Sequence, residues 1–372
     1  MKGIVIWAHS TCRSVMGLYR ELIKVAGVPA VITLWRYPKD GCAKSAVRLG
    51  SGFRMDEFSD LPLVPIGDDY EKCRQFLLEH KECLQLFCDY QLSACRRRLI
   101  CDAKVLGCRV GVLNEAPCNM DTGMKFLLKE IFIRVVLPVR LSEAISSADF
   151  FVNYSGGDDR FVSTIGWPKD KVLNFGYFPP PIEGSRCVLR TTNKPFTILA
   201  TGLLSKYRGA DVLVDALKIL KDRGVKYRAI ITQNGELLDQ LKTIASRYSL
   251  PIEFPGRVEL PRLIELYESC SVYVGTGRHE PWGMRLNDAL NCGAPLVVSR
   301  GMGGCKLVDD CGCGLTFRSD DAIDLANRLQ ELAEDETIYM QCAKNSVKAA
   351  ACCSPTKKAG ELFAFIRPFC RE

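Results

Sequence analysis

Short apolar runs that alternate with longer amphipathic stretches are the feature of this sequence that most limits its fold. A run of four to eight apolar residues fits a strand buried on both faces, and the intervening stretches have helical length and periodicity. This alternation is typical of a parallel sheet covered by helices on both faces. The predicted strands are GIVIWA (3–8), PAVITLW (29–35), CLQLFCDY (83–90), RVGVLNEA (109–116), ADFFVNYS (148–155), FTILATG (196–202), YRAIITQ (227–233), IEFPG (252–256), SVYVGTG (271–277) and PLVVSRG (295–301).

A stretch rich in proline, glycine and polar residues, NFGYFPPPIEGSRCVLRTTNKP (174–195), separates the two sets of strands at the middle of the chain. The length of 372 residues suits two domains of ordinary size better than one. We therefore predict two doubly wound α/β domains that face each other across a cleft, because ligands of such sheets bind at the carboxyl ends of the strands. The predicted boundaries are an N-terminal domain over 1–180, a linker over 181–195, a C-terminal domain over 196–350, and a last helical segment over 351–372 that packs back on the N-terminal domain.

The composition excludes several classes of protein. Apolar residues make up 47% and charged residues 25%, and no apolar run reaches the roughly 18 residues of a membrane span. The N-terminus has no cleavage-site pattern, so we expect a cytoplasmic protein whose 19 cysteines are reduced and mostly buried. The absence of C-x-x-C pairs and the three histidines argue against a metal site. No basic run interleaved with aromatic residues points to nucleic acid.

The stretch RHEPWGMRLNDALNCGAPLVVS (278–299) is the strongest functional motif. It predicts a loop at the end of a buried strand and then a helix that begins near Gly283 and closes at Cys292-Gly293. Glu280 lies in the loop, and Asp288 lies one and a half turns into the helix. The amides at such a helix start favour an anion, typically phosphate.

A ligand that lies across this helix start would meet a carboxylate at each end and amides between them. Carboxylates accept hydrogen bonds from sugar hydroxyls, so the pattern points to a nucleotide sugar. The alternative is that Glu280 caps the helix while Asp288 is an ordinary surface charge.

Two further strand ends supply candidate partners. ATGLLSKYRGADVLVDALKIL (200–220) places Lys206 or Arg208 near a pyrophosphate, with Gly209 permitting close approach. SRGMGGCKLVDD (299–310) places three glycines after the next strand, although a simple turn explains them nearly as well.

HEPWGMRLNDALNCGAPLVVSRGMGG resembles the Glu-x7-Glu segment of retaining GT-B glycosyltransferases, glycosyltransferase family 4 in particular. TGLLSKYRGADVLVDAL and ITQNGELLDQL fall where that family has its Gly-Arg-Leu…Lys-Gly and Gly-x-Gly loops. The resemblance covers about 196–335. It implies a GT-B fold and transfer from a nucleotide sugar, with UDP favoured over GDP and no obligatory cofactor or metal.

The resemblance also implies roles for individual residues. Glu280 would bind the donor sugar and Asp288 the ribose. The amides of Met284 and Arg285 would hold the phosphates, with Arg208 beside the pyrophosphate, and Gly235 would lie near the base or ribose. The donor-binding residues expected together are Gly202, Lys206, Arg208, Gly209, Gly235, Glu280, Gly283, Met284, Arg285 and Asp288.

Three positions depart from the family pattern. The second glutamate is Asp288, which is one methylene shorter, and the arginine of Gly-Arg-Leu is Leu203, for which Lys206 or Arg278 is expected to substitute. The histidine often found at a strand end of the first domain is absent from VGVLNEAP, where Asn114 and Glu115 stand instead.

The acceptor is expected on the first domain, with a saccharide or lipid-linked saccharide of O-antigen, capsule or other surface glycan biosynthesis as the implied class. The catalytic candidates are Glu280 and Arg208 on the donor side and Glu115 near the acceptor hydroxyl. The acceptor-side candidates are His9, Ser10, Arg13, Asp89, Asn114, Glu115 and Tyr154.

MKFLLKEIFIRVVLPVRLSEAI (124–145) mixes large apolar residues with four basic ones. Two interpretations fit equally: a helix at the interface of an anionic membrane, on the inner face of which the protein would then lie, or a core helix whose charges reach solvent. The first 190 residues carry 26 Lys and Arg against 21 Asp and Glu, which favours an anionic partner on this half.

Two other functions remain open from the sequence. One is a sugar-nucleotide epimerase of the same fold, which would need a clear acid–base constellation. The other is a degenerate domain that binds a sugar nucleotide or acts as a scaffold, as the changes at Leu203 and Asp288 would allow.

Overall fold

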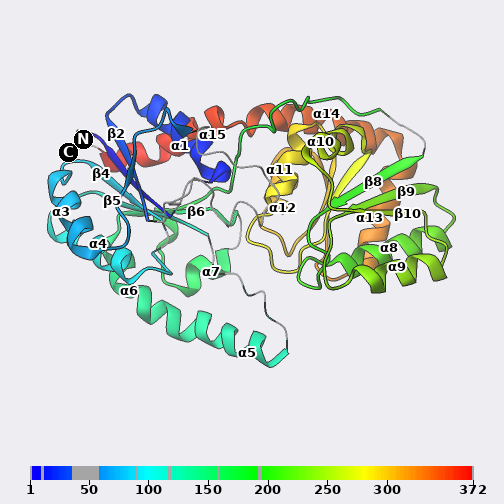
Figure 1. Ribbon diagram of the computed structural model, residues 1–372, viewed down its shortest axis with the longest axis horizontal. Coiled ribbons are helices and arrows are strands. Elements are labelled where there is room, and N and C mark those ends of the chain that lie inside the picture. The colour runs from blue at the N-terminus through cyan, green and yellow to red at the C-terminus, as the bar shows by residue number, and fades with distance from the viewer. Residues whose placement is uncertain are drawn as a thin grey trace. The chain divides into compact units, whose positions relative to one another are not determined.

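The computed structural model divides the chain into two compact units, which we describe separately (Figure 1). Unit 1 comprises residues 1–180 and 354–372, and unit 2 comprises residues 181–353. The structure describes residues 2–9, 12–35, 58–88, 90–115, 117, 119, 121, 123–156, 159–191 and 195–370.

Unit 1 contains a seven-stranded parallel sheet of order β3-β2-β1-β4-β5-β6-β7. The chain runs outward from β1 in one direction and from β4 in the other, so the sheet has its topological switch point between these two strands. Its strands are β1 (Ile4–Ala8), β2 (Ala30–Leu34), β3 (Leu63–Pro65), β4 (Leu84–Phe87), β5 (Val110–Asn114), β6 (Phe150–Asn153) and β7 (Val172–Asn174). Its helices are α1 (Arg13–Ala26), α3 (Tyr70–Glu79), α4 (Ala94–Val105), α5 (Gly123–Ile131), the π-helical η2 (Phe132–Val136), α6 (Leu137–Ser147), α7 (Asp159–Thr164), the 3-10 turns η3 (Lys169–Lys171) and η4 (Arg367–Cys370), and α15 (Pro355–Ile366).

Unit 2 repeats the design with a six-stranded parallel sheet of order β10-β9-β8-β11-β12-β13, and its switch point lies between β8 and β11. Its strands are β8 (Phe196–Thr201), β9 (Tyr227–Thr232), β10 (Ile252–Gly256), β11 (Val272–Gly275), β12 (Leu296–Ser299) and β13 (Gly314–Phe317). Its helices are α8 (Ala210–Asp222), α9 (Leu238–Arg247), α10 (Leu260–Ser269), α11 (Met284–Asn291), α12 (Cys305–Cys311), α13 (Ala322–Glu334) and α14 (Glu336–Cys352).

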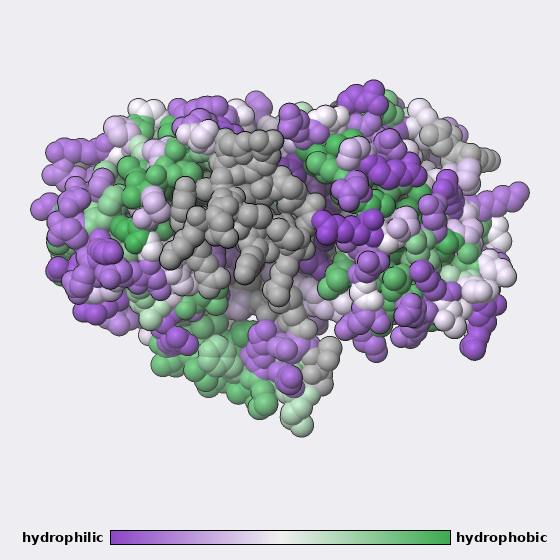
Figure 2. Space-filling model, in the orientation of Figure 1, coloured by the Kyte–Doolittle hydropathy of each residue, from purple (hydrophilic) through white to green (hydrophobic). Residues whose placement is uncertain are grey.

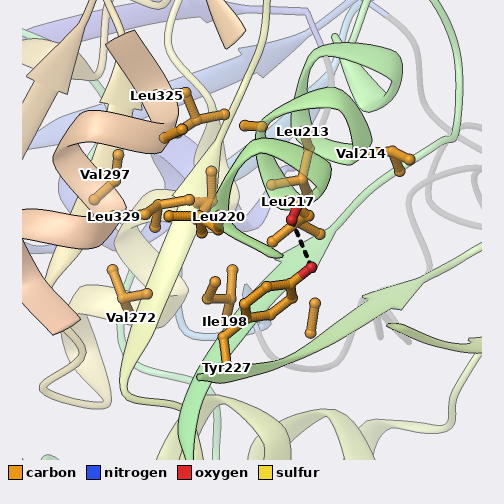
Figure 3. Packing of buried hydrophobic residues seen from close by; sticks show 14 of the residues in the cluster. Ile198, Leu213, Val214, Leu217, Leu220, Tyr227, Val272, Val297, Leu325 and Leu329 are labelled. Carbon is orange, nitrogen blue, oxygen red and sulfur yellow. Dashed lines mark hydrogen bonds between the residues drawn. The ribbon is translucent and has the colours of Figure 1, made fainter. Parts of the chain in front are cut away.

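The core of unit 2 forms where one face of α8 meets the sheet (Figure 3). Leu213, Leu217 and Leu220 recur at helical spacing and are almost fully buried. Each such side chain contributes about 1.5–3 kcal/mol when it leaves water. The hydroxyl of Tyr227, at the start of β9, donates to the carbonyl oxygen of Leu217 at 2.6 Å, so its polar atom is satisfied inside the core.

Each of the ten predicted strands is confirmed, and so is the division into two doubly wound sheets. Three further strands, β3, β7 and β13, were not predicted; they are three or four residues long and lie at sheet edges. Gly314 shows why β13 was missed. A Cβ at this position would lie 1.8 Å from the carbonyl oxygen of Leu296, so close strand packing requires a residue that has no β propensity.

The described residues of the segment expected as a linker, 181–191 and 195, belong to unit 2 by their contacts. Arg190 anchors this segment: this arginine is 4% exposed and donates hydrogen bonds to the carbonyl oxygens of Tyr267, Cys270 and Cys292. At the other end of the chain, α15 lies against α1 in unit 1, where the Thr356 hydroxyl donates to Glu21 at 2.8 Å. The polypeptide therefore returns to its first unit after it completes the second.

Seventeen of the cysteines lie in the described part of the chain, and all of these are free thiols. Seven are buried, eight are half-buried, and Cys187 and Cys352 are exposed, so fewer are fully buried than the sequence analysis expected. Within the same residues, no helix combines the length and apolar character that crossing a bilayer requires.

Candidate functional site

A pocket lies at the switch point of the unit 2 sheet, where β8 and β11 end side by side. Its volume is about 50 Å³. Five of the ten predicted donor-binding residues line it: Gly202, Arg208, Glu280, Gly283 and Arg285. The rest of the lining comes from β8 and β11 and the loops that follow them, from β9, from the first turns of α8 and α11, and from Met302, which follows β12.

The loops after β8 and β11 are tied together, and this brings Arg208 to Glu280. The Thr276 hydroxyl donates to the carbonyl oxygen of Arg208 at 2.7 Å, and the Arg278 amide donates to that of Tyr207 at 3.1 Å. Gly209 has a φ of +68°, and a Cβ there would lie 2.2 Å from the carbonyl oxygen of Thr276. Glycine at this position therefore allows the two strand ends to approach.

The guanidinium of Arg208 donates to the carboxylate of Glu280, and the two form an ion pair. Their side chains are 30% and 12% exposed, so the pair is shielded from solvent on the carboxylate side. Burial disfavours the charge on Arg208, but the carboxylate outweighs it and raises the pKa of the guanidinium. The pocket therefore holds a fixed positive charge directly beside its carboxylate.

The glycine loop after β12 fixes the backbone of Glu280. The Glu280 amide donates to Gly301 at 2.9 Å, and the Gly303 amide donates to Glu280 at 3.0 Å. A Cβ on Gly301 would lie 2.2 Å from the carbonyl oxygen of Arg278, and one on Gly304 would lie 2.6 Å from that of Trp282. These glycines thus serve close packing between two loops, rather than direct approach to a ligand.

Helix α11 starts at the pocket wall, as predicted, and ends at Cys292 with Gly293 in the left-handed conformation. Arg285 was predicted to act through its amide, but its guanidinium also reaches the pocket, because a Cβ on Gly202 would lie 3.4 Å from its Nη1. A second cation is therefore present where the Gly-Arg-Leu arginine is replaced by Leu203. An arginine at the second position of a helix that starts at a strand end is the signal that could have identified it.

Arg278 was expected to substitute for that missing arginine, but its donors are already used. It donates to both carboxylate oxygens of Asp211, at 2.8 and 3.0 Å, to Asp320 at 2.6 Å and to the carbonyl oxygen of Lys206. Its role is to brace the β8 loop against the start of α8. Lys206 is exposed, and its side chain is not part of the pocket.

The remaining predicted donor residues lie outside the pocket lining. A Cβ on Gly235 would lie 2.2 Å from the carbonyl oxygen of Leu204, so this glycine lets the β9 loop pack on the β8 loop.

Asp288 is half-buried on α11. Burial raises the pKa of the Tyr267 hydroxyl, and the charge of Asp288 adds to this effect. The hydroxyl oxygens of Tyr267 and Tyr273 lie 3.0 and 3.1 Å from the Thr201 hydroxyl oxygen, so the three groups form a small network. Burial raises the pKa of Tyr273 to about 12. Tyr273 lines the pocket that holds Glu280. The hydroxyl network therefore links the surroundings of Asp288 to this pocket, although Asp288 is not one of its lining residues.

A second and larger pocket, of about 690 Å³, lies at the switch point of the unit 1 sheet. It is lined by residues at the ends of β1, β4, β5 and β6, among them the predicted acceptor residues His9, Asn114, Glu115 and Tyr154. Arg13 is not part of the lining and donates to the carbonyl oxygen of Pro180 at 2.5 Å. The predicted Ser10 and Asp89 lie outside the described residues.

Besides the predicted Tyr154, this pocket has aromatic residues that were not predicted, Tyr19, Phe132 and Tyr177. Tyr177 donates a hydrogen bond to Glu115, and burial together with that carboxylate raises the pKa of the Tyr177 hydroxyl well above its ordinary value. The Tyr177 ring lies 4.9 Å from that of Tyr154, and Tyr19 of α1 also lines the wall. Tyr177 follows β7 inside a proline-rich stretch, where nothing in the sequence pattern distinguishes it from a linker residue.

Comparison with known proteins agrees with this architecture. Residues 183–349 match the model of the family described as Glycosyl transferases group 1. The chain is 38% identical over 100 residues to the GDP-mannose-dependent alpha-(1-6)-phosphatidylinositol dimannoside mannosyltransferase of Mycobacterium tuberculosis. This match covers 27% of this chain and 26% of that protein. It is 22% identical over 244 residues, 62% of each chain, to the N,N'-diacetylbacillosaminyl-diphospho-undecaprenol alpha-1,3-N-acetylgalactosaminyltransferase of Campylobacter jejuni.

Solved structures match over nearly the whole chain. Anabaena HepE in complex with UDP has a TM-score of 0.68 and 15% identity, over 99% of this chain and 100% of that chain. The lipopolysaccharide outer core galactosyltransferase WaaB has a TM-score of 0.66 and 12% identity, over 98% and 99%. The chain therefore has the GT-B fold of glycosyltransferases, and its second unit carries the segment that matches the group 1 family.

Proposed function

We propose that the protein is a retaining glycosyltransferase that takes a sugar from a nucleotide-sugar donor bound to unit 2 and transfers it to a hydroxyl of a saccharide or lipid-linked saccharide bound to unit 1. The observation that carries this proposal is the unit 2 pocket, where Arg208, Arg285 and Glu280 meet at the start of α11 within the family-matching segment. A pocket of about 50 Å³ is smaller than the several hundred Å³ typical of whole-ligand sites. It has room for one part of a donor, whose remainder would lie outside it.

The charges suit the bond that breaks. When the sugar C1–O bond to the diphosphate is cleaved, negative charge develops on the leaving oxygens, and fixed cations and helix-start amides stabilise that charge. Arg208, Arg285 and the first amides of α11 would do this, while Glu280 accepts hydrogen bonds from sugar hydroxyls. The acceptor hydroxyl attacks from the leaving-group face, its oxygen forms the new bond to C1, and its proton passes to the departing diphosphate. No enzymic nucleophile is needed.

Donor and acceptor identities are the finer parts of the proposal. A UDP-sugar is the first donor to test, because Anabaena HepE was solved with UDP, and a GDP-sugar is the second, because the mycobacterial relative is GDP-mannose-dependent. Relatives described as acting on a diphospho-undecaprenol saccharide and in colanic acid biosynthesis support an acceptor of surface glycan assembly.

A thermal-shift screen of UDP- and GDP-sugars tests the donor assignment. A ligand at a hundredfold excess over its dissociation constant stabilises the folded state by about 2.7 kcal/mol. We expect stabilisation by one nucleotide sugar and its loss in Arg208→Met. If no nucleotide sugar shifts the melting curve of the wild-type protein, the proposed function is wrong.

Product analysis separates the proposal from its alternatives. Incubation of the stabilising donor with an acceptor glycan should yield an α-linked product from an α-linked donor. A donor whose sugar is inverted at a ring carbon in the absence of acceptor would indicate an epimerase, and binding without turnover would indicate a scaffold.

A further inference from the structure

An apolar surface covers one face of the continuous helical segment α5–η2–α6 in unit 1. Eight large apolar side chains on this segment are 40–76% exposed. They follow a helical repeat, so they form one stripe that runs for about 25 Å along the helix. Figure 2 shows the hydrophobic colour concentrated over α5 and α6, at the lower edge of the view. The stripe consists of Met124, Leu127, Leu128, Ile131, Phe132, Val135, Val136 and Val139.

This arrangement differs from that of an ordinary amphipathic helix, which turns its apolar face to the core. The C-terminal part of the segment is ordinary, because Leu137, Leu141 and Ile145 are buried against unit 1. The N-terminal part projects away from the sheet in Figure 1, and its apolar face meets solvent. The core-helix interpretation therefore holds for the buried face of α6 but not for α5.

Basic side chains border the stripe. Residues 123–147 carry four Lys and Arg against two Glu, and Lys125, Arg134 and Arg140 are exposed. Among the residues that the structure describes, Arg134 pairs only with Glu130 on the same helix, and its own side chain is 72% exposed in that contact. A surface pair of this kind contributes little and leaves the cation available to a stronger anion.

The stripe is also continuous with the unit 1 pocket. Phe132 belongs to both, because it is 40% exposed and lines the pocket. Arg140 and Lys129, from the same helical segment, bring two cations to the pocket wall, where Lys129 also pairs with Asp121 at 3.3 Å. A molecule with an apolar tail and an anionic head would thus find an apolar path that leads to a pocket with two cations on its wall.

We propose that unit 1 docks on an anionic lipid bilayer through the exposed face of α5–η2, so that the unit 1 pocket receives its acceptor from that surface as a lipid with an anionic head group. The second part of this proposal rests on the proposed function, whereas the docking itself does not. Apolar side chains enter the acyl boundary, and the flanking cations meet the lipid phosphates, which is the binding mode of interfacial helices.

Vesicle flotation tests the docking without donor or acceptor. The full chain is mixed with vesicles of phosphatidylcholine alone or with about 30% phosphatidylglycerol. We expect the protein to float with the anionic vesicles, to bind the neutral ones less, and to be released partly by salt. Leu127→Ser combined with Leu128→Ser and Ile131→Ser should lower the partition coefficient at least about tenfold, because three apolar side chains no longer enter the bilayer.

The matched control replaces three scattered exposed apolar residues, Val25→Ser, Val105→Ser and Ile323→Ser, which are 41%, 87% and 59% exposed. It should float as the wild type does, and both variants should keep the wild-type melting temperature. The docking proposal is overturned if the wild type stays with the soluble fraction, or if the stripe variant floats unchanged. A wild-type dimer that the stripe variant converts to a monomer would also overturn it, since the stripe would then be a subunit interface.

The same variants separate this proposal from the proposed function. Docking on vesicles without stabilisation by any nucleotide sugar would support the docking proposal and contradict the proposed function. Nucleotide-sugar stabilisation with no flotation would do the reverse.

Discussion

The two pockets occupy equivalent places in their units and differ in size and in lining. Each lies at the switch point of a parallel sheet, where adjacent strands lead to helices on opposite faces and leave a crevice. The unit 2 pocket is about 50 Å³, glycine-lined and built around an ion pair. The unit 1 pocket is about 690 Å³ and is lined by tyrosines, by Asn114 and Glu115, and by the cations Lys129 and Arg140. The shared topology therefore decides where a ligand binds, and the loop residues decide what it is.

The difference also concerns how the walls are made. Unit 2 holds its charged side chains by loop-to-loop hydrogen bonds and by glycines that would clash if they carried a Cβ. In unit 1, Glu115 shares its pocket with the rings of Tyr154 and Tyr177. One face of the helical segment α5–η2–α6, many of whose other side chains are exposed, completes the wall. Under the proposed function, the rigid charges of unit 2 would suit the anionic group that all donors share, and the wide aromatic wall of unit 1 would suit the rings of a saccharide acceptor.

The largest effect should come from removing the fixed cation of unit 2. Arg208→Met should lower the rate of transfer about 10²–10³-fold, because the developing diphosphate charge loses a preorganised donor. The rate is measured with saturating acceptor, and Arg228→Met, on an exposed arginine that pairs only with Glu253 among described residues, is the control. A variant with wild-type turnover would show that Arg208 takes no part in catalysis, and that the unit 2 pocket is not distinguished by this cation.

The next largest effect concerns the close approach of the two strand ends in unit 2. Gly209→Ala should lower the free energy of unfolding by about 2–3 kcal/mol, because the residue has a φ of +68° and its new Cβ would meet the Thr276 carbonyl. Chemical denaturation measures this change. Gly224→Ala also has a positive φ but nothing within 4 Å of its Cβ, so it should cost distinctly less. Equal costs would show that the loop contact contributes nothing.

A smaller effect is expected in unit 1. Tyr177→Phe keeps the ring and removes the hydroxyl that donates to Glu115, which should lower kcat/KM for the acceptor about tenfold. The thermal shift produced by the nucleotide sugar should not change, because the donor pocket is a separate cavity of unit 2. Loss of donor binding in this variant would contradict the assignment of the two pockets to different substrates.

The smallest effect is expected from a glycine in α15, the helix that packs on α1 in unit 1. Gly360 lies in the middle of α15, and a Cβ there would meet nothing within 4 Å. Gly360→Ala should therefore raise the free energy of unfolding by about 0.5–1 kcal/mol, since alanine loses less backbone entropy in a helix. Denaturation of the variant beside wild type checks the sign. A decrease would mean that this helix position is crowded in solution.

Much of unit 2 could be predicted because its information is local. The stretch 278–299 holds a strand end, a loop, a helix start and a helix end within about twenty residues, and each of these has a recognisable residue type. Gly293 illustrates this, since its left-handed conformation follows from its place after a helix. The side-chain reach of Arg285 could not be predicted, because it depends on the position of Gly202, which lies more than eighty residues earlier in the chain.

The sequence by itself determined the two-sheet architecture, ten of the strands and the location of the charged motif, because apolar periodicity and turn residues act over short distances. Only the tertiary structure decided that Arg278 braces a loop, that Tyr177 joins Glu115, and that the apolar face of α5 is exposed. Each of these depends on which segments become neighbours after folding. A residue's type limits which contacts it can make, but long-range packing decides which of those contacts form.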